Sequence, residues 1–510
     1  MPMKTLRTIL SLLANPAATI MAAAALAAPA SAQNPDLPMP PAFLRAMEPM
    51  EPRDSDTVRT VETHHSIVIG GRTIPYRAIV TETPVRNDAG EVAVVAVSYG
   101  YIAEGGTQDQ VRPVLFIFNG GPGASSSPLH MNAFGPRRMV TGDNGSARMA
   151  DNPHSLIDVA DLVFIDPPGT GASMPVKGRD PASLFSVDGD ARAVADMVQQ
   201  WRVANGRENA PFALVGESYG TARALAMLGA QIKGDQPLPD GVALFSLSIG
   251  GGDGPVMSDV SLFPTLAATA WYHDAVDRGG MGVDEFFAKA LAFAQGEYAD
   301  ALILGAAAEP AQRQRVAKGM ERFLGLPAEQ FLQSGLKLDR QAFMLGLLAD
   351  KGLRTGQLDG RVTRPVAESN FHPPFDDPSM SLGTETGNTI ARYLGDELGY
   401  TLPAPYRSLN LGINFKWNWG DRQTYATREY VPYLVAAREQ KPDISLLTVG
   451  GYYDITTPVH TGIFALNAAG IGPSQRQSIA YPAGHSAFED EDVLTRFAQD
   501  MRVWASSLKR

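Results

Sequence analysis

Residues 212–220 read Phe-Ala-Leu-Val-Gly-Glu-Ser-Tyr-Gly, an apolar run that ends in a G-x-S-x-G sequence centred on Ser218. The uniformly apolar run is typical of a strand that is covered on both faces. A helical pattern begins near Thr221. A serine between such a strand and a helix sits on a sharp turn that exposes its hydroxyl at the carboxyl end of the sheet. Ser218 is therefore predicted to be a catalytic nucleophile.

Similar apolar runs occur on both sides of this segment. Residues 113–118 and 160–166 precede it, residues 188–204 directly before it have helical spacing, and apolar runs return at 444–449 and 477–481. Strands that alternate with helices predict a mostly parallel central sheet, and hence an α/β fold. The alternating pattern of residues 60–103 instead predicts antiparallel strands that open the sheet.

The remaining stretches set the expected domain organisation. Residues 256–405 are dominated by helical patterns, and we expect them to form a helical cap inserted into the sheet-forming core. The core then consists of an N-terminal part, 60–255, and a C-terminal part, 406–510. Residues 33–59 are rich in proline and predict an extended lead-in.

Residues 1–32 have the features of a cleaved export signal. Lys4 and Arg7 precede an interrupted apolar stretch, and Ala30-Ser31-Ala32 matches a small-residue cleavage site. Cleavage after Ala32 would leave a periplasmic or secreted protein. No later run of about 18 apolar residues follows, so stable membrane insertion is not expected.

Charge and cysteine content exclude several classes of function. The net charge is −11, which disfavours nucleic acid as a partner because phosphate binding needs clustered Lys and Arg. The chain has no cysteine, so disulfides, thiolate nucleophiles and thiolate metal sites are excluded. We expect neither a metal nor a cofactor.

A serine nucleophile needs a base, and a histidine is the usual one. Of the eight histidines, His485 is distinguished by its loop directly after the predicted strand 477–481. Asp454 follows the preceding strand and is predicted to orient the histidine. The order Ser218, Asp454, His485 is the order expected in α/β-hydrolases, whereas Asp443 precedes its strand and would lie at the wrong edge of the sheet.

The tetrahedral intermediate also needs backbone N–H donors for its oxyanion. Tyr219, the residue after the nucleophile, is one predicted donor. The glycine-rich turn Asn119-Gly120-Gly121-Pro122-Gly123 follows an apolar strand and would let its backbone approach a ligand closely.

Together, "NGGPGASS", "NPHSLIDVADLVFIDPPGTGAS", "GESYG", "GGYYDITTP" and a late "GH" resemble the serine carboxypeptidase family, and "GQLDGR" at 356–361 resembles its bacterial members. The resemblance implies an α/β-hydrolase fold and release of C-terminal residues through an acyl-enzyme. It implies that Ser218, Asp454 and His485 form the triad and that Gly121 and Tyr219 form the oxyanion hole. It further implies that Asn119 and Glu217 hold the free carboxylate of a peptide substrate.

Two positions depart from the family pattern. Ala124 replaces the usual cysteine, and Ala133 replaces a second glutamate that would lie beside Glu217. Two close carboxyls raise one another's proton affinity, and a protonated one can donate to a substrate carboxylate. Without this partner Glu217 can stay ionised. The sequence therefore leaves open whether the protein keeps the family's strict carboxypeptidase activity and its acid pH optimum. It also leaves open whether His130, Arg137 or Arg138 compensates.

The residues leave other activities of this fold open. An esterase, an aminopeptidase acting on proline-ended peptides and an acyltransferase need the same triad. A non-enzymatic binding protein on this fold usually lacks a triad member, whereas all three residues are present here in order. The preferred side chain of the substrate and the oligomeric state are not predicted.

Overall fold

The computed structural model describes residues 41–105, 112–141, 146–250, 254–368, 377–380, 384–420 and 428–509. The predicted signal peptide and residues 33–40 lie outside them. The chain divides into two compact units. The larger comprises Pro41–Asp253, Leu382–Gly451 and Thr457–Arg510, and the smaller includes Gly254–Ser381 and Tyr452–Thr456.

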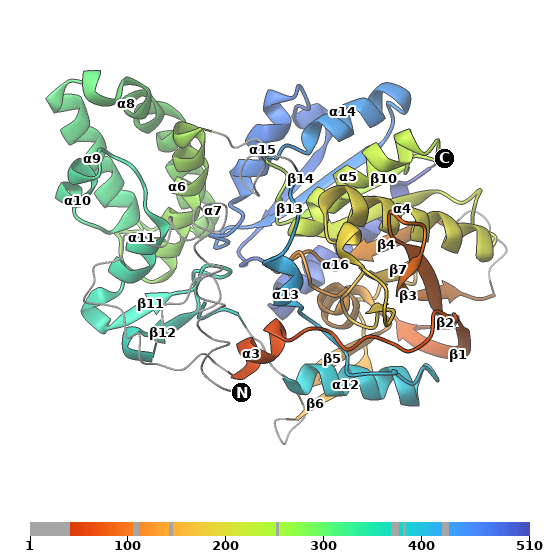
Figure 1. Ribbon diagram of the computed structural model, residues 1–510. Helices are drawn as coiled ribbons and strands as arrows, with labels where there is room; N and C mark the ends of the chain where they lie inside the picture. The colour runs from red at the N-terminus through yellow and green to blue at the C-terminus, as the bar shows by residue number, and fades with distance from the viewer. Residues whose placement is uncertain are drawn as a thin grey trace. The chain divides into compact units, whose positions relative to one another are not determined.

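The larger unit is built on a mixed sheet in the order β1-β2-β3-β7-β4-β9-β10-β13-β14, with β8 paired to β3 (Figure 1). Its strands are β1 (Thr60–Ile69), β2 (Arg72–Arg86), β3 (Val92–Ala103), β4 (Val114–Phe118), β7 (Asp161–Asp166), β8 (Met174–Pro175), β9 (Phe212–Glu217), β10 (Gly241–Phe245), β13 (Ser445–Gly451) and β14 (Gln477–Tyr481), with β5 (Arg137–Thr141) and β6 (Ala147–Asp151) in a separate hairpin. The pairs from β7 to β14 are all parallel, and β1, β2 and β3 are antiparallel. The predicted mostly parallel sheet with antiparallel opening strands is therefore present.

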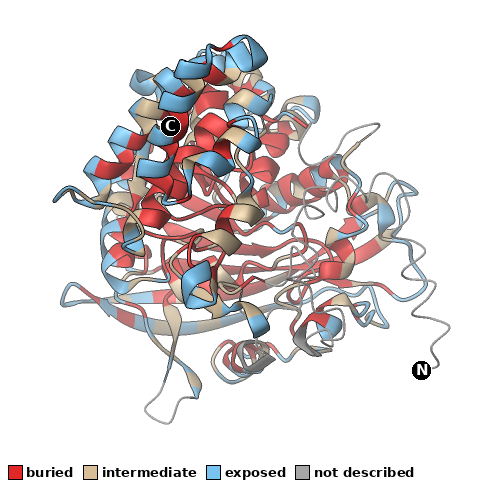
Figure 2. Ribbon diagram, turned by 90° about the vertical axis from the view of Figure 1, so that its left-hand side faces the viewer, coloured by how far each residue is buried: buried red, intermediate tan, exposed pale blue. Residues whose placement is uncertain are grey.

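Helices cover both faces of this sheet, which explains why its central strands are mostly apolar. Every residue of β4, β7, β9 and β10 is buried, as the red strands of Figure 2 show. The helices of this unit are α3 (Pro41–Met47), η2 (Leu129–Phe134), η3 (Ala182–Leu184), α4 (Val187–Ala204), α5 (Tyr219–Lys233), α12 (Thr384–Asp396), α13 (Leu411–Asn414), α14 (Val431–Gln440), α15 (Val459–Ala468), η8 (Pro473–Gln475) and α16 (Glu491–Ser507). Apolar side chains of α4, α5 and α14 share one core cluster, and those of η2, α12 and α16 share the other.

The direction of the chain changes between β4 and β9. From β4 the chain goes to β7 on one side, and it then returns past β4 to β9 on the other side. In open parallel sheets, such a switch point leaves a crevice beyond the carboxyl ends of the two strands, where ligands bind. The Asn119 turn follows β4 and Ser218 follows β9, so both predicted elements lie at this point.

The smaller unit is mainly helical, as the pattern of its sequence predicts. It contains α6 (Pro255–Tyr272), α7 (Val283–Phe293), η4 (Ala294–Tyr298), α8 (Ala299–Leu304), η5 (Gly305–Ala307), α9 (Pro310–Leu324), α10 (Ala328–Gln333), α11 (Arg340–Gly346), η6 (Ala349–Lys351), η7 (Val366–Glu368) and the short strands β11 (Leu353–Thr355) and β12 (Thr363–Pro365). Phe263 packs with Phe293, Tyr298 and Phe323 at centroid distances of 5.3 to 5.9 Å. This aromatic cluster ties α6, α7, η4 and α9 together.

The smaller unit ends earlier in the chain than the predicted insertion 256–405. Helix α12 packs in the larger unit, where Ile390, Tyr393 and Leu394 are buried in the core of the sheet. Their spacing places them on one apolar face of the helix. Within the described residues, no helix combines the length and apolar character that a membrane span requires.

Candidate active site

Ser218 occupies a strained turn between β9 and α5. Its φ of 58° and ψ of −129° lie outside the regions that L-residues usually adopt. A Cβ at Gly216 would lie 2.2 Å from the Gly220 carbonyl oxygen, and one at Gly220 would lie 2.8 Å from that of Phe118, so only glycine fits at these positions. The Ser218 amide donates to the Phe245 carbonyl of β10 (2.9 Å), which holds the turn in place. Such strain costs on the order of 1–3 kcal/mol and is typical of functional turns.

The glycine-rich turn after β4 lies against the start of α5. A Cβ on Gly120 would be 2.4 Å from the Tyr219 amide nitrogen and 2.6 Å from that of Gly220. Gly121 has a φ of 100°, which favours glycine. The turn closes with a hydrogen bond from the Ala124 amide to the Gly120 carbonyl (3.1 Å). The two segments predicted to supply the oxyanion hole, Gly121 and Tyr219, are thus brought together.

Glu217 is buried beside this turn, with both carboxylate oxygens engaged. Asn119 Nδ2 donates to Oε2, and Ser486 Oγ donates to Oε1 at 2.9 Å. Glu217 and Asn119 are 4% and 3% exposed. The two residues predicted to hold a substrate carboxylate are therefore in direct contact, and Ser486 is a third member that the sequence analysis did not identify. Its position directly after His485 was the available signal.

An ion pair lies behind Asn119. Arg223 of α5 contacts Asp190 of α4 with 2.6 Å between Nε and Oδ2, and it also donates from Nη1 to the Asn119 carbonyl. The two side chains are 1% and 2% exposed. Burial raises the pKa of Asp190, and the positive charge of Arg223 opposes that rise. The pair was not apparent from the sequence, because neither residue belongs to a recognisable motif.

His485 lies in the loop after β14, as predicted. A Cβ on Gly451, the last residue of β13, would be 2.0 Å from the Gly484 carbonyl oxygen, so this loop packs closely against the end of β13. Ser246 Oγ donates to the His485 carbonyl, and Nδ1 of His485 lies 3.2 Å from Oγ1 of Thr457.

Hydrogen bonds connect the His485 loop to the nucleophile turn from both sides. Ser246 directly follows Phe245, which accepts from the Ser218 amide, and Ser486 bonds to Glu217, the residue before Ser218. The loop of the predicted base and the turn of the predicted nucleophile are thus neighbours within the larger unit.

Asp454 lies three residues after the end of β13 and is buried. Its segment, Tyr452–Thr456, belongs to the smaller unit. There the amides of Ile455 and Thr456 both donate to the Gln357 carbonyl (3.0 and 3.2 Å), and the Gly360 amide donates to Tyr453 (2.9 Å). The "GQLDGR" stretch therefore holds the Asp454 segment, a role that was not inferred from the sequence. The orienting role of Asp454 stays a prediction.

Six other histidines lie within the described residues. Their contacts are His64 with Glu104, His65 with Thr63, His130 with Tyr101, His154 with Glu491 and His273 with the Gly360 carbonyl, while His460 lies beside Phe464. His372 lies outside the described residues. Burial lowers the pKa of His130 to about 3 and that of His460 to about 4, so both are neutral at physiological pH.

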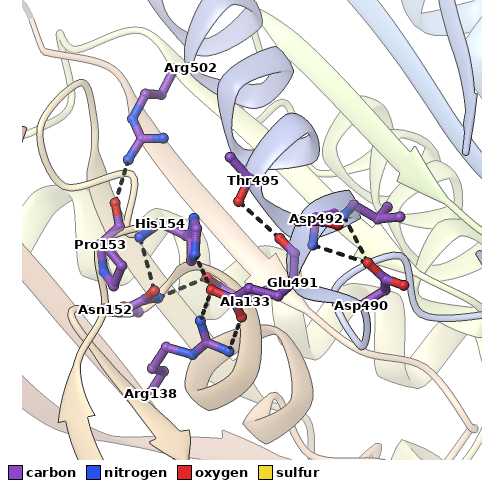
Figure 3. Close-up of polar contacts among 12 residues, drawn as sticks. Ala133, Arg138, Asn152, Pro153, His154, Asp490, Glu491, Asp492, Thr495 and Arg502 are labelled. Atoms are coloured by element: carbon purple, nitrogen blue, oxygen red, sulfur yellow. Dashed lines mark hydrogen bonds and ion pairs between the residues drawn. The ribbon is translucent and has the colours of Figure 1, made fainter.

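Ala133 is fully buried in η2, and its carbonyl accepts from Asn152 Nδ2 at 2.8 Å (Figure 3). The three candidates for compensation are engaged elsewhere. Arg138 makes two hydrogen bonds to Glu491 of α16 (2.9 and 2.8 Å), as Figure 3 shows. Arg137 pairs with Asp151 and Glu397, and neutral His130 bonds to Tyr101. Glu217 accepts hydrogen bonds from Asn119 and Ser486.

In the described part of the chain, no group of three or more His, Asp or Glu side chains is arranged to hold a metal ion. The chemistry that the site offers is that of a serine nucleophile beside a glycine-rich turn at a sheet switch point.

Residues 96–297 match the model of the serine carboxypeptidase family. The resemblance to this family is confirmed. The matched residues include Asn119, Glu217 and Ser218, and they identify the chain as a serine hydrolase of the carboxypeptidase type. No curated relative matches the sequence.

One solved structure supports the fold of this carboxypeptidase-type hydrolase. Kex1, a prohormone-processing carboxypeptidase from Saccharomyces cerevisiae, superposes with a TM-score of 0.52 at 14% identity, over 84% of this chain and 91% of that chain. A thermophilic esterase from Thermogutta terrifontis (14% identity, 88% of this chain and 100% of that chain) matches with a TM-score of 0.34. The esterase LipA from Xanthomonas oryzae (11% identity, 89% and 98%) matches with a TM-score of 0.36. The similarity to Kex1 confirms the predicted α/β-hydrolase fold.

Proposed function

We propose that this serine carboxypeptidase-type hydrolase is an exported peptidase that removes C-terminal residues from peptides through an acyl-enzyme on Ser218. The observation that carries the proposal is the juxtaposition of three elements. The strained Ser218 turn, the Gly120–Gly121 backbone and the Asn119–Glu217 pair meet at the switch point of the sheet. Export rests on the signal sequence, with cleavage after Ala32 and a periplasmic or secreted destination.

Each residue has a role in the proposed reaction. His485 takes the Ser218 hydroxyl proton as Oγ forms a bond to the carbonyl carbon of the scissile peptide. The Tyr219 and Gly121 amides stabilise the oxyanion, and Asp454 orients the histidine and stabilises its positive charge. His485 then gives the proton to the leaving nitrogen as the C–N bond breaks. Water, deprotonated by the same histidine, attacks the ester and releases the shortened peptide.

The leaving amino acid carries the free C-terminal carboxylate. In this proposal Asn119 and Glu217 contact that carboxylate, which places the last peptide bond beside Ser218. Substrates are peptides with a free C-terminus, and neither nucleic acid nor stable membrane insertion is involved. The strongly acidic composition supports the exclusion of nucleic acid.

The test is mass spectrometry of a synthetic peptide mixture during incubation with the purified mature enzyme. Stepwise loss of single residues from the C-terminus is the expected result. Loss of N-terminal residues, or hydrolysis of short acyl esters with intact peptides, would overturn the proposal in favour of an aminopeptidase or an esterase. The Ser218→Ala variant, incubated in parallel, controls for contaminating peptidases.

A further inference from the structure

One segment of the larger unit lies along the glycine-rich turn. We call residues 407–419, which include α13, the clamp segment. The Ser125 amide, just after the turn, donates to the Ser408 carbonyl (2.9 Å), and the Asn410 amide donates to the Gly123 carbonyl (2.8 Å). A Cβ on Gly123 would lie 2.4 Å from the Asn410 carbonyl oxygen, so the contact leaves no space for a side chain. The clamp segment is therefore packed directly on the turn.

Asn414, the last residue of α13, adds a side-chain contact to the same turn. Its Nδ2 donates to the Pro122 carbonyl at 3.1 Å. Pro122 and Gly123 are buried, whereas Gly121 is exposed. The turn is thus anchored on its buried side, while the predicted oxyanion donor at Gly121 stays accessible to a substrate.

The clamp segment also supports the second predicted donor, the Tyr219 amide. The ring of Tyr219 packs edge-to-face with Trp417 and Trp419 at centroid distances of 5.3 and 5.7 Å, and Tyr219 is 1% exposed. These aromatic contacts hold the start of α5, and hence the Tyr219 amide, in place. One segment therefore contacts both halves of the predicted oxyanion hole.

The direction of the Gly121 N–H follows from two planar peptide groups. This N–H shares a peptide plane with the Gly120 carbonyl, which accepts from the Ala124 amide at 3.1 Å. The Ala124 N–H in turn shares a plane with the Gly123 carbonyl, which the clamp segment holds. A shift of the turn on its buried side would therefore change where the Gly121 N–H points.

Asn414 acts between these two planes. The Pro122 carbonyl belongs to a peptide group that links them, and Asn414 Nδ2 fixes its orientation. We propose that Asn414 is a positioning residue of the oxyanion hole, which keeps the Gly121 N–H directed at the carbonyl oxygen of the substrate. This inference rests on the proposed function and identifies a residue on which its oxyanion hole depends.

Loss of the Asn414 amide should lower kcat with little change in KM. Asn414→Ala leaves the buried Pro122 carbonyl without this donor, which favours rotation of its peptide group toward another partner. Misplacement of a catalytic group by about 1 Å costs roughly 100-fold in rate, so we expect kcat to decrease by about 10- to 100-fold. KM should hold, because oxyanion donors bind the transition state more strongly than the substrate carbonyl.

The experiment measures kcat and KM for one peptide with wild type, Asn414→Ala, Asn414→Asp and Asn205→Ala. Asn414→Asp keeps the shape of the side chain but replaces the donor by an oxygen, so it should lower kcat at least as much as Asn414→Ala. Asn205→Ala is the matched control, because half-buried Asn205 also donates from Nδ2 to a carbonyl, that of Trp201 at the end of α4 (2.9 Å). Thermal unfolding of each variant verifies that it is folded.

A second measurement reports on the oxyanion hole itself. In a peptide boronic acid, boron takes the place of the scissile carbonyl carbon. Ser218 Oγ bonds to the boron, the serine proton passes to His485, and a boron-bound oxygen occupies the oxyanion position. The affinity of Asn414→Ala for this inhibitor should fall by about the same factor as kcat/KM. A purely structural defect would lower the fraction of active enzyme and leave the affinity of the active molecules unchanged.

A decrease in kcat and in boronate affinity in both Asn414 variants, with KM and Asn205→Ala unchanged, supports the inference. The inference is wrong if Asn414→Ala behaves as Asn205→Ala does, if only KM changes, or if the boronate affinity stays constant.

The outcomes also separate the two proposals. If wild type hydrolyses acyl esters but no peptide, the peptidase function is wrong, and the same variants compared on the ester decide the role of Asn414. If wild type neither hydrolyses an acyl substrate nor binds the boronic acid, both proposals fail.

Discussion

Arg223 and Asp190 form a buried ion pair, 2.6 Å long, whose arginine also holds the carbonyl of Asn119. The pair links α5, which begins at the nucleophile, to α4 and to the glycine-rich turn. Taking two charges out of water is costly, so the benefit of such a pair depends on both members being present. Its position suggests two consequences, one for stability and one for catalysis.

Arg223→Met should destabilise the protein by about 3–5 kcal/mol, because it leaves the Asp190 carboxylate buried without a partner. It should also lower kcat/KM, since Asn119 loses the contact at its carbonyl. Urea unfolding and peptide hydrolysis measure the two effects. The double variant Arg223→Met, Asp190→Leu should recover much of the stability.

The matched control for this pair is Arg192→Ala. Arg192 of α4 forms an exposed ion pair with Asp88, with the two side chains 50% and 68% exposed. Loss of an exposed pair costs about 0–1 kcal/mol. If Arg223→Met lowers the free energy of unfolding by no more than Arg192→Ala does, the structural role of the buried pair is contradicted.

Ser218→Ala should abolish hydrolysis, with a decrease in kcat on the order of 10⁶-fold, while the fold remains intact. Alanine and serine are similar in size and meet the same strain at a φ of 58°. The measurement is peptide turnover together with labelling by a fluorophosphonate that reacts with activated serines. Retained turnover in the folded variant would refute the assignment of the nucleophile.

Gly120→Ala should impair catalysis through the backbone. The added Cβ would lie 2.4 Å from the Tyr219 nitrogen and 2.8 Å from the Glu217 carbonyl oxygen, so the turn must move away from the nucleophile. Misplacement of one oxyanion donor costs about 10²- to 10³-fold in kcat. Gly395→Ala is a suitable control, because a Cβ at that position in α12 meets nothing within 4 Å. Equal activity of the two variants would argue against an oxyanion role for the turn.

Glu491→Gln should change the pH dependence of stability. Hydrogen bonds from Arg138 lower the pKa of Glu491 to about 2 from an ordinary value of 4.5 (Figure 3). A folded-state pKa below the unfolded value means that the stabilisation is complete above about pH 4.5 and is lost as the pH falls toward 2. The glutamate side chain is 60% exposed, so the effect should be modest.

Chemical unfolding at pH 7 and at about pH 3 compares wild type with Glu491→Gln. The difference in the free energy of unfolding should shrink at the lower pH, where Glu491 is protonated in the unfolded chain but still mostly ionised in the folded protein. A difference that is constant with pH would mean that the charge of Glu491 does not contribute.

Much of the fold and part of the candidate site were predictable from local patterns. The strand and helix on either side of Ser218, the antiparallel opening strands and the parallel strands that follow appear where the hydrophobic periodicity placed them. The extent of the helical unit was less predictable. The apolar face of α12 is compatible with either unit, and its burial against the sheet became apparent only in the structure.

The sequence by itself determined the nucleophile turn, the glycine-rich turn and the chain order of Ser218, Asp454 and His485. Each of these depends on residues that are close along the chain, so short-range steric rules suffice to recognise them. Only the tertiary structure decided which side chains contact these elements. Ser486 and Glu217 are 269 positions apart, and Arg223 and Asp190 are 33 apart. Such pairs depend on how the sheet brings its strand ends and helices together, and no local pattern encodes that. Thus the sequence identified a lone glutamate beside the nucleophile, and the fold supplied the serine that binds it.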